Sequence, residues 1–216
     1  MANSYAGKIL SIDLSKKNKK RIHALDMNLA KKFLGGKGLG AKLLYDLLPA
    51  KTDPLSPRNP LMYVTGPLTC TIAPSNRYCI VTKSPHTGTF LDSYAGGTFG
   101  EELKFAGFDV VIISGKANRP VYLQISDDDV QVHSAEHLWG LDTYQTYDVL
   151  KSDINDKKAR VSCIGPAAER LVKYALVDCE LHRQAGRGGA GAVMASKNLK
   201  AIVARGTKGI KAADME

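Results

Sequence analysis

The sequence predicts an α+β domain with mainly antiparallel sheets and flanking helices. Strand-like segments outnumber helical ones, and most strands follow one another through short turns, which is typical of antiparallel pairing. No G-x-G-x-x-G motif follows the first strand, so a doubly wound dinucleotide-binding fold is not expected. Neither GAGAVMAS nor GGTFGEE continues into the lysine and hydroxyl residue that close a P-loop.

The first half of the chain alternates short strands with glycine-rich turns. Residues 8–14 alternate apolar and polar side chains as a half-buried strand does, and 21–25 can pair back on them. Asp26 is a good N-cap for a helix to Phe33, which ends at the glycine pair 35–36. Further predicted elements are a helix over 39–48, a proline-rich turn region over 49–60, and strands over 61–64, 78–82 and 89–93, with a hairpin turn at 86–88.

The second half of the chain has the same mixture of strands and helices. The predicted elements, in order, are a helix over 98–105, strands over 109–114, 121–125 and 130–133, a helical turn ending at 137–140, a helix capped by Asp142 and running to about 152, a strand over 160–164, a turn and strand over 165–177, a helix over 190–195 and a strand over 200–204. The predicted domain is therefore 1–205, with 206–216 as a polar tail or the start of an interdomain linker.

Size and composition indicate a soluble globular protein of one large or two small domains. The chain has 216 residues, of which 44% are hydrophobic and 24% charged. No apolar run approaches the roughly 20 residues that span a bilayer. The N-terminal MANSYAGKIL lacks the pattern of a signal peptide, so we expect a cytoplasmic protein without a membrane anchor.

The net charge of +9 fits a phosphate-rich partner but is partly local. A basic cluster between two strand-like runs, which we interpret as a solvated hairpin turn, contains Lys16, Lys17, Lys19, Lys20 and Arg21. The cluster lacks the aromatic residues that stack on bases, so a nucleic-acid partner is not favoured. Cys70, Cys79, Cys163 and Cys179 have no metal-binding spacing and are expected to be reduced, mostly buried thiols.

The stretch 182–198, HRQAGRGGAGAVMASKN, is the strongest candidate for a binding site. It combines four glycines with Arg183, Arg187 and Lys197 around a short helix signal, which suits a phosphate or diphosphate. The structural alternative is a glycine turn packed between a strand and a helix. Similar glycine-rich helix entries occur at 35–40 and 95–100, and two of the three could converge on phosphates or on a metal between them.

The remaining polar residues suggest a cofactor platform and not a self-sufficient catalyst. Arg77, Arg183 and Arg187 each sit beside a turn or strand end, where a guanidinium can pair with phosphate or carboxylate. His182 can be catalytic or merely structural, and Asp178 and Glu180 can pair with the arginines or accept hydrogen bonds from a heterocycle. No nucleophile–base pair and no paired carboxylates suited to acid–base chemistry are found.

Three runs resemble the N-terminal domain of the aldehyde ferredoxin oxidoreductases, which carry a tungsten- or molybdenum-bis-pterin cofactor. They are GPLTCTIAPSNRYCIVTKSPHTGTF, YAGGTFGEELKFAGFDVVIISGKANRPVY and HRQAGRGGAGAVMASKNLKAI. The resemblance covers nearly the whole chain. It implies two sheets folded into a saddle, on which the cofactor sits.

The resemblance also implies a site, which we call the clamp, made of residues 93–100 and 182–198. A magnesium ion between the pterin phosphates would take backbone carbonyls matching Tyr94 and Gln184, and Arg77 would lie between the pterin and the iron–sulfur cluster. Arg187 and Lys197 match no cofactor role. The implied cofactor-binding residues are Arg77, Ser93, Tyr94, Ala95, Gly96, Gly97, Arg183, Gln184, Ala185, Gly186 and Gly188.

Family members are about three times as long, and the ligands of their 4Fe–4S cluster lie in later domains. The resemblance therefore implies the base domain of an enzyme that oxidises aldehydes to carboxylates and passes electrons to ferredoxin or another carrier. The chain is expected to be inactive without the remaining domains or a subunit carrying the cluster ligands, and homo-oligomers are compatible with the resemblance. Substrate and choice of metal stay open. The alternatives are a stand-alone phosphate- or nucleic-acid-binding module and a non-catalytic assembly subunit.

Overall fold

The chain folds into two six-stranded sheets with helices around them. In this computed structural model the described residues are 4–15, 19–71 and 75–211. The first sheet has the order β2 (Lys19–Ala24), β1 (Lys8–Asp13), β6 (Val110–Ser114), β3 (Leu61–Val64), β4 (Tyr78–Lys83), β5 (Phe90–Ala95). The second has the order β11 (Arg183–Ala185), β10 (Val177–Cys179), β9 (Arg160–Cys163), β12 (Leu199–Arg205), β7 (Val121–Ser126), β8 (Asp129–Ser134).

Antiparallel pairing dominates both sheets. The parallel pairs are β1 with β6 and β7 with β12, and the other described pairings are antiparallel. The predicted α+β class with mainly antiparallel sheets and flanking helices is confirmed. The predicted hairpin between β1 and β2 also forms, although Lys16, Lys17 and Asn18 lie outside the described residues.

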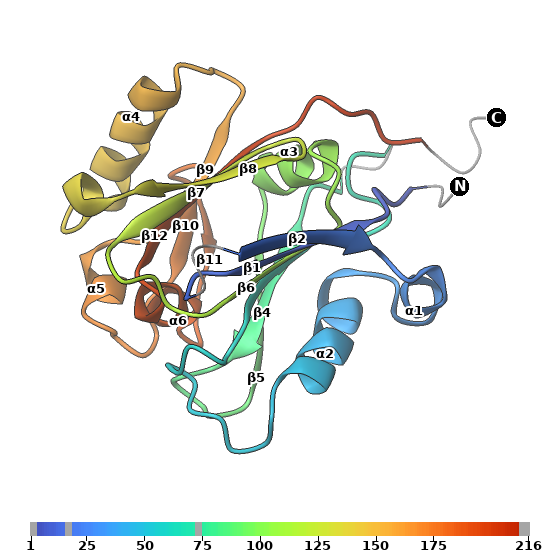
Figure 1. Cartoon of the computed structure of the whole chain (residues 1–216), viewed down its shortest axis with the longest axis horizontal. Helices are drawn as coiled ribbons and strands as arrows, with labels where there is room; N and C mark the ends of the chain where they lie inside the picture. The colour runs from blue at the N-terminus through green and yellow to red at the C-terminus, as the bar shows by residue number, and fades with distance from the viewer. Residues whose placement is uncertain (1–3, 16–18, 72–74, 212–216) are drawn as a thin grey trace.

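The helices cover the outer faces of the sheets and fill the space between them. The helical elements of the described residues are α1 (Met27–Phe33), α2 (Gly36–Leu47), α3 (Phe99–Phe105), the 3-10 turn Glu136–Leu138, α4 (Thr143–Ile154), α5 (Pro166–Glu169) and α6 (Ala190–Ser196). As Figure 1 shows, α4 and α5 lie on one side of the molecule and α1 and α2 on the other. The core between the sheets includes residues of both α3 and α6.

Two helix starts follow the predicted capping chemistry. The Asp26 carboxylate accepts hydrogen bonds from the backbone N–H groups of Asn28 and Leu29. Asp142 caps α4 by accepting from the backbone N–H of Gln145, and Oε1 of Gln145 accepts in turn from the backbone N–H of Asp142, which completes a capping box. These local bonds satisfy N–H groups that would otherwise lack partners in the first turn.

Three local predictions were wrong. The second helix begins at Gly36 instead of Leu39, because glycines inside it allow close packing: a Cβ at Gly40 would lie 2.6 Å from Cγ2 of Val81. A short helix, α5, begins with a proline where only a turn was expected. Residues 183–185 form strand β11, which was not among the predicted elements and which pairs with β10.

The core between the sheets is centred on three fully buried aromatic rings. Tyr63, Tyr78 and Phe99 have ring centroids 5.4 to 5.8 Å apart. The Tyr63 hydroxyl lies 3.1 Å from Oγ of Ser162, and the Tyr78 hydroxyl contacts Sγ of Cys179. Both of these tyrosines of the first sheet therefore bond to residues of the second sheet. These polar contacts fix how the two sheets lie against each other.

Several basic side chains serve the core and are not available to a ligand. Lys104, Lys197 and Lys200 are fully buried. Lys200 pairs with Glu169 at 2.5 Å, whereas Nζ of Lys197 donates to the carbonyl oxygen of Pro57 at 3.3 Å. Lys197, one of the three cations first counted in the stretch 182–198, is therefore structural. Cys79, Cys163 and Cys179 are buried free thiols and Cys70 is half-buried, as predicted.

Burial lowers the pKa of Lys197 to about 8, and this predicts a pH dependence of stability. A lysine in the unfolded chain has a pKa of about 10.4, so between these values the unfolded state binds more protons than the folded state. The free energy of unfolding should rise by about 3 kcal/mol as pH increases through this window. Urea denaturation of the wild type and of Lys197→Met tests this. The wild type should gain stability relative to the variant, and parallel pH profiles would contradict the burial argument.

Candidate functional site

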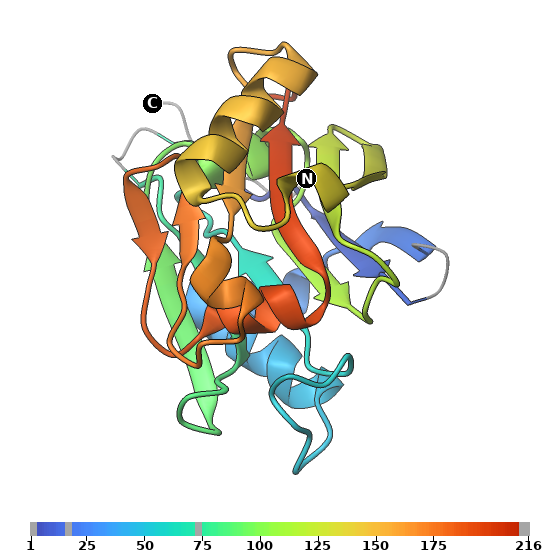
Figure 2. The same ribbon diagram turned by 90° about the vertical axis from the view of Figure 1, so that its left-hand side faces the viewer.

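The two halves of the clamp meet where the edges of the two sheets come together. Strand β5 is the edge of the first sheet and β11 the edge of the second, and Figure 2 shows them side by side. Oγ of Ser93 donates a hydrogen bond to the carbonyl oxygen of Gly186 at 2.7 Å. Among the described residues no backbone hydrogen bond joins the two strands. Because they are edge strands, both keep backbone groups that a sheet partner does not use.

A second connection joins the clamp at the start of α3. The Glu180 carboxylate, in the hairpin between β10 and β11, accepts hydrogen bonds of 2.6 Å from both the backbone N–H and the hydroxyl of Thr98. Arg160 of β9 pairs with the same carboxylate at 2.8 Å. Glu180 thus fixes the start of α3, which follows the edge strand β5, to the second sheet.

Between these two connections lies an open surface next to Arg183. A Cβ placed on Gly96 would lie 3.8 Å from both Cδ of Arg183 and Oδ1 of Asn76, which is ordinary contact. A Cβ on Gly186 would meet nothing within 4 Å. Folding alone therefore does not require glycine for space at either position, and both leave room for a ligand near the backbone.

Arg77 and Arg183 provide the positive charge of this surface. Both are exposed, and neither guanidinium makes a hydrogen bond or ion pair within the described part of the chain. Arg77 directly precedes β4, and continuing the register Tyr78↔Ala95 places it opposite Gly96. Arg187, although it falls within the range 182–198, lines a separate pocket together with His86 and Tyr174.

The other predicted site residues differ in whether their side chains or only their backbone groups are accessible to a ligand. Ala95 and Ala185 are buried, so only their backbone groups can reach a ligand. Tyr94 is 45% exposed, and partial burial raises the pKa of its hydroxyl to about 12. Gln184 is exposed, and its Nε2 donates to Oδ2 of Asp178 at 3.3 Å. Burial raises the pKa of Asp178, whose Oδ1 is buried without a hydrogen-bond partner in the described structure.

Neither helix start in the clamp is open to an anion, which corrects the prediction from the glycine-rich entries. The backbone N–H of Gly191, in the first turn of α6, donates to the carbonyl oxygen of Ala175 at 3.0 Å, and the helix is buried. The Glu180 carboxylate already occupies the start of α3. The third entry, 35–40, lies at α2 outside the clamp, and its Lys37 pairs with Asp92 of β5 at 3.3 Å.

Most glycines of the clamp have packing reasons. A Cβ on Gly97 would lie 2.0 Å from Oε2 of Glu180, and one on Gly188 would lie 2.3 Å from Cδ1 of Leu91. A Cβ on Gly189 would lie 2.0 Å from the carbonyl oxygen of Lys173, and one on Gly191 would lie 2.2 Å from that of Leu176. The structural alternative for the stretch 182–198 is thus correct for its helix, while the open surface is limited to its first residues.

Three residues were missed by sequence reasoning. Asn76 and Arg160 reach the clamp, and Thr98 within it bonds to Glu180, through contacts between distant segments that no spacing motif in the sequence marks. Glu180 was considered a partner for the arginines of the clamp, but it pairs with Arg160. His182 is exposed and makes no side-chain hydrogen bond among the described residues, so no catalytic partner identifies it.

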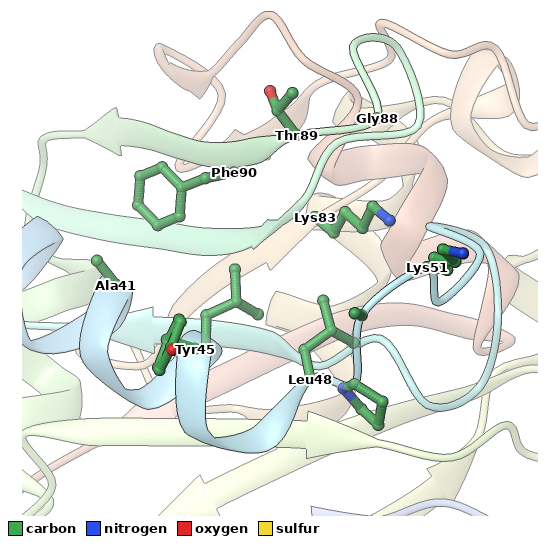
Figure 3. Close-up of a pocket in the computed structure, with 11 residues that line it drawn as sticks. Ala41, Tyr45, Leu48, Lys51, Lys83, Gly88, Thr89 and Phe90 are labelled. Atoms are coloured by element: carbon green, nitrogen blue, oxygen red, sulfur yellow. The ribbon is translucent and has the colours of Figure 1, made fainter.

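A separate groove of about 610 Å³ lies at the opposite end of β5. It runs between the C-terminal half of α2 and the hairpin that leads into β5, with Tyr45 and Phe90 on its two sides (Figure 3). Its lining is mainly apolar, apart from Lys51, Lys83 and Thr89. The groove shares no residue with the clamp and brings no acid–base pair together.

The comparison with known families decides the relationship. The family model described as "Aldehyde ferredoxin oxidoreductase, N-terminal domain" matches residues 9–206. The chain belongs to the aldehyde ferredoxin oxidoreductase family. The predicted resemblance is confirmed, and the two sheets described above are the N-terminal domain of this family.

Relatives of this aldehyde ferredoxin oxidoreductase domain are much longer. The tungsten-containing aldehyde ferredoxin oxidoreductase of Pyrococcus horikoshii is 47% identical over 97% of the chain, which covers 35% of that relative. The aliphatic sulfonate oxidoreductase, WOR-like subunit, of Pyrococcus furiosus is 38% identical over 94% of the chain, again 35% of the relative. The active site complex BamBC of benzoyl coenzyme A reductase superposes with a TM-score of 0.94 at 39% identity, covering 97% of this chain and 32% of that one.

The glycines of the clamp predict a contrast in stability. Gly186→Ala should change the free energy of unfolding by no more than about 0.5 kcal/mol, because the new methyl group meets no neighbour. Gly188→Ala should cost about 2 kcal/mol, because Gly188 has φ +63 and its Cβ would overlap Leu91. Chemical denaturation of the two variants measures both values, and equal losses would contradict the open surface at Gly186.

Proposed function

We propose that this chain is the cofactor-binding base of a tungsten- or molybdenum-bis-pterin aldehyde oxidoreductase. The supporting observation is the open surface at Gly96 and Gly186, flanked by the guanidinium groups of Arg77 and Arg183, which have no side-chain partner among the residues that the structure describes. The names of the relatives support tungsten, since those of four archaeal relatives contain it. A phosphate needs hydrogen-bond donors and positive charge, and this surface offers both.

The residues present fit the phosphate end of such a cofactor. Arg183 would pair with phosphate oxygens beside Gly96, and the missing side chain at Gly186 would let the ligand approach the backbone. The backbone carbonyls of Tyr94 and Gln184 would bind a magnesium ion between the two phosphates, since carbonyl oxygens are suitable ligands for this cation. Ser93, Ala95, Gly97, Ala185 and Gly188 would shape the backbone around these groups.

In this proposal the domain binds and orients the cofactor and supplies its electrostatic surroundings. The bound metal–pterin group would supply the oxidation of aldehyde to carboxylate, and a 4Fe–4S cluster held by the remaining domains or a partner subunit would accept the electrons. Arg77, at the rim of the clamp, would carry positive charge on the side facing the cluster. Ferredoxin is the proposed acceptor and the cytoplasm the proposed location; the described structure has no helix long and apolar enough to span a bilayer.

The isolated chain should not catalyse aldehyde-dependent reduction of a viologen dye. It spans about a third of the length of its relatives, and the proposed cluster ligands lie in the other two thirds. The same assay with the remaining domains added, in protein from tungstate-fed cells, should give activity. Turnover by the isolated chain would contradict the proposal.

Arg183 and Arg187 form a matched pair for testing phosphate binding. In the complete protein, Arg183→Ala should reduce retained tungsten and pterin about tenfold or more, since a charge-assisted pair contributes about 1.5–3 kcal/mol. Arg187→Ala removes another exposed arginine, four residues away, that lines a different pocket, and should retain the cofactor. Metal analysis and pterin fluorescence after gel filtration measure both. Equal retention in the two variants would count against the assignment of Arg183.

A further inference from the structure

The contacts of Glu180 join three segments that the sequence keeps far apart. Its Oε2 accepts from the Thr98 backbone N–H at 2.6 Å, and its Oε1 accepts from the Thr98 hydroxyl at 2.6 Å. Nε of Arg160 lies 2.8 Å from Oε1 and 2.6 Å from the Thr98 hydroxyl oxygen, so the three side chains form a closed triangle. Nη1 of Arg160 donates to the Lys157 carbonyl oxygen at 2.9 Å, which holds the arginine in place.

The backbone around this triangle is shaped to admit the carboxylate. Glu180 and Leu181 both have positive φ, at 55° and 66°, a conformation that costs free energy in non-glycine residues. Gly97, also at positive φ, leaves the space that Oε2 of Glu180 occupies. Thr98 makes no side-chain cap to its own helix, because its hydroxyl is bonded to Glu180. Glu180 and Leu181 thus adopt an unfavourable backbone conformation, and Thr98 loses its side-chain cap, while the contact between Glu180 and Thr98 is kept.

The triangle lies where it can set the geometry of the clamp. Gly97 is next to Gly96, and Arg183 follows Glu180 by three residues in the same hairpin. The Cβ position of Gly97 is 3.4 Å from Cγ of Arg183, so the Arg183 side chain passes directly over the segment that Glu180 holds. A change in the distance between Glu180 and Thr98 would therefore move Arg183 relative to Gly96.

We propose that Glu180 is a positioning residue which, with Arg160 and Thr98, fixes the spacing between Gly96 and Arg183. Glu180 holds the two sides of the clamp at a set distance. Its carboxylate is bonded to Thr98 and Arg160 and does not bind a ligand. Loss of the carboxylate charge would free the hairpin, and Arg183 would then have to be ordered when phosphate binds. This inference rests on the proposed function for its consequence, but not for the tether itself.

Glu102 provides a matched control for Glu180. It is also a largely buried glutamate, with its side chain 12% exposed against 16% for Glu180. It pairs α3 with Arg205 of β12 at 3.4 Å, which is likewise a contact between α3 and the second sheet, and it additionally accepts from the backbone N–H of Gly206 at 2.8 Å. The two glutamates differ in that the carboxylate of Glu180 contacts Thr98 of the clamp, whereas the carboxylate of Glu102 contacts Arg205 and Gly206.

The experiment uses the complete protein with Glu180→Gln, Glu102→Gln, Thr98→Val and Thr98→Ser. Amide hydrogen exchange of the cofactor-free protein reports on the tether, and the rate of tungsten and pterin loss from loaded protein reports on its consequence. Glu180→Gln and Thr98→Val should speed exchange at residues 96–98 and 183–186 and speed cofactor loss about tenfold, the effect of losing one charge-assisted hydrogen bond. Glu102→Gln and Thr98→Ser should leave both readouts near wild type, even where thermal stability falls.

The outcomes separate the two proposals. If Glu180→Gln and Glu102→Gln change both readouts equally, Glu180 is an ordinary structural contact and the inference is overturned. If Glu180→Gln speeds exchange but not cofactor loss, the positioning of Arg183 is likewise refuted. If even the wild type retains no tungsten or pterin, the proposed function fails, while the exchange data still decide whether Glu180 holds the two sides together.

Discussion

The contact between the free edges of the two sheets is the constraint on which the rest of the structure depends. Strands β5 and β11 share no backbone ladder among the described residues, so side chains must hold them together: Ser93 on Gly186 and Glu180 on Thr98. Behind them, the buried contacts of Tyr63 with Ser162 and of Tyr78 with Cys179 fix the sheets at the level of the core. Edge strands joined by side chains keep backbone groups available, which is what a site built on carbonyl and amide groups needs.

Some positively charged side chains stabilise the fold, and others are exposed at the clamp. Buried lysines such as Lys104 and Lys197 donate to backbone carbonyls, and Arg160 and Arg205 are held in ion pairs. Arg77 and Arg183 are exposed and without side-chain partners in the described structure. The net charge of +9 is therefore a poor guide to the ligand, because much of it stabilises the fold, whereas the two unpaired arginines beside open glycines are informative.

The sequence predicted most elements, because strand alternation and the Asp26 and Asp142 caps are local signals. It missed β11, which forms only by pairing with β10. It placed the start of α2 too late, because Gly40 is required by close packing against Val81 of β4, a contact between distant segments. The pairing of segments 93–100 and 182–198 came from family resemblance and not from periodicity. Which glycines are open could not be predicted, since Gly186 and Gly188 look alike in sequence, whereas in the structure only Gly188 has a positive φ and lies against Leu91. The partner of Glu180 could not be predicted either, because Arg160 is brought near it by the tertiary fold.

Locating the metal and the cofactor phosphates in an experimental structure of the complete, tungsten-loaded protein tests the central claim most directly. Anomalous diffraction at a tungsten absorption edge would place the metal, and the electron density would place the phosphates. We expect phosphates beside Gly96 and Gly186, within hydrogen-bonding distance of Arg183, and a cation facing the carbonyls of Tyr94 and Gln184. Cofactor density at the groove between α2 and Phe90, or a clamp that holds no phosphate in loaded protein, would contradict it.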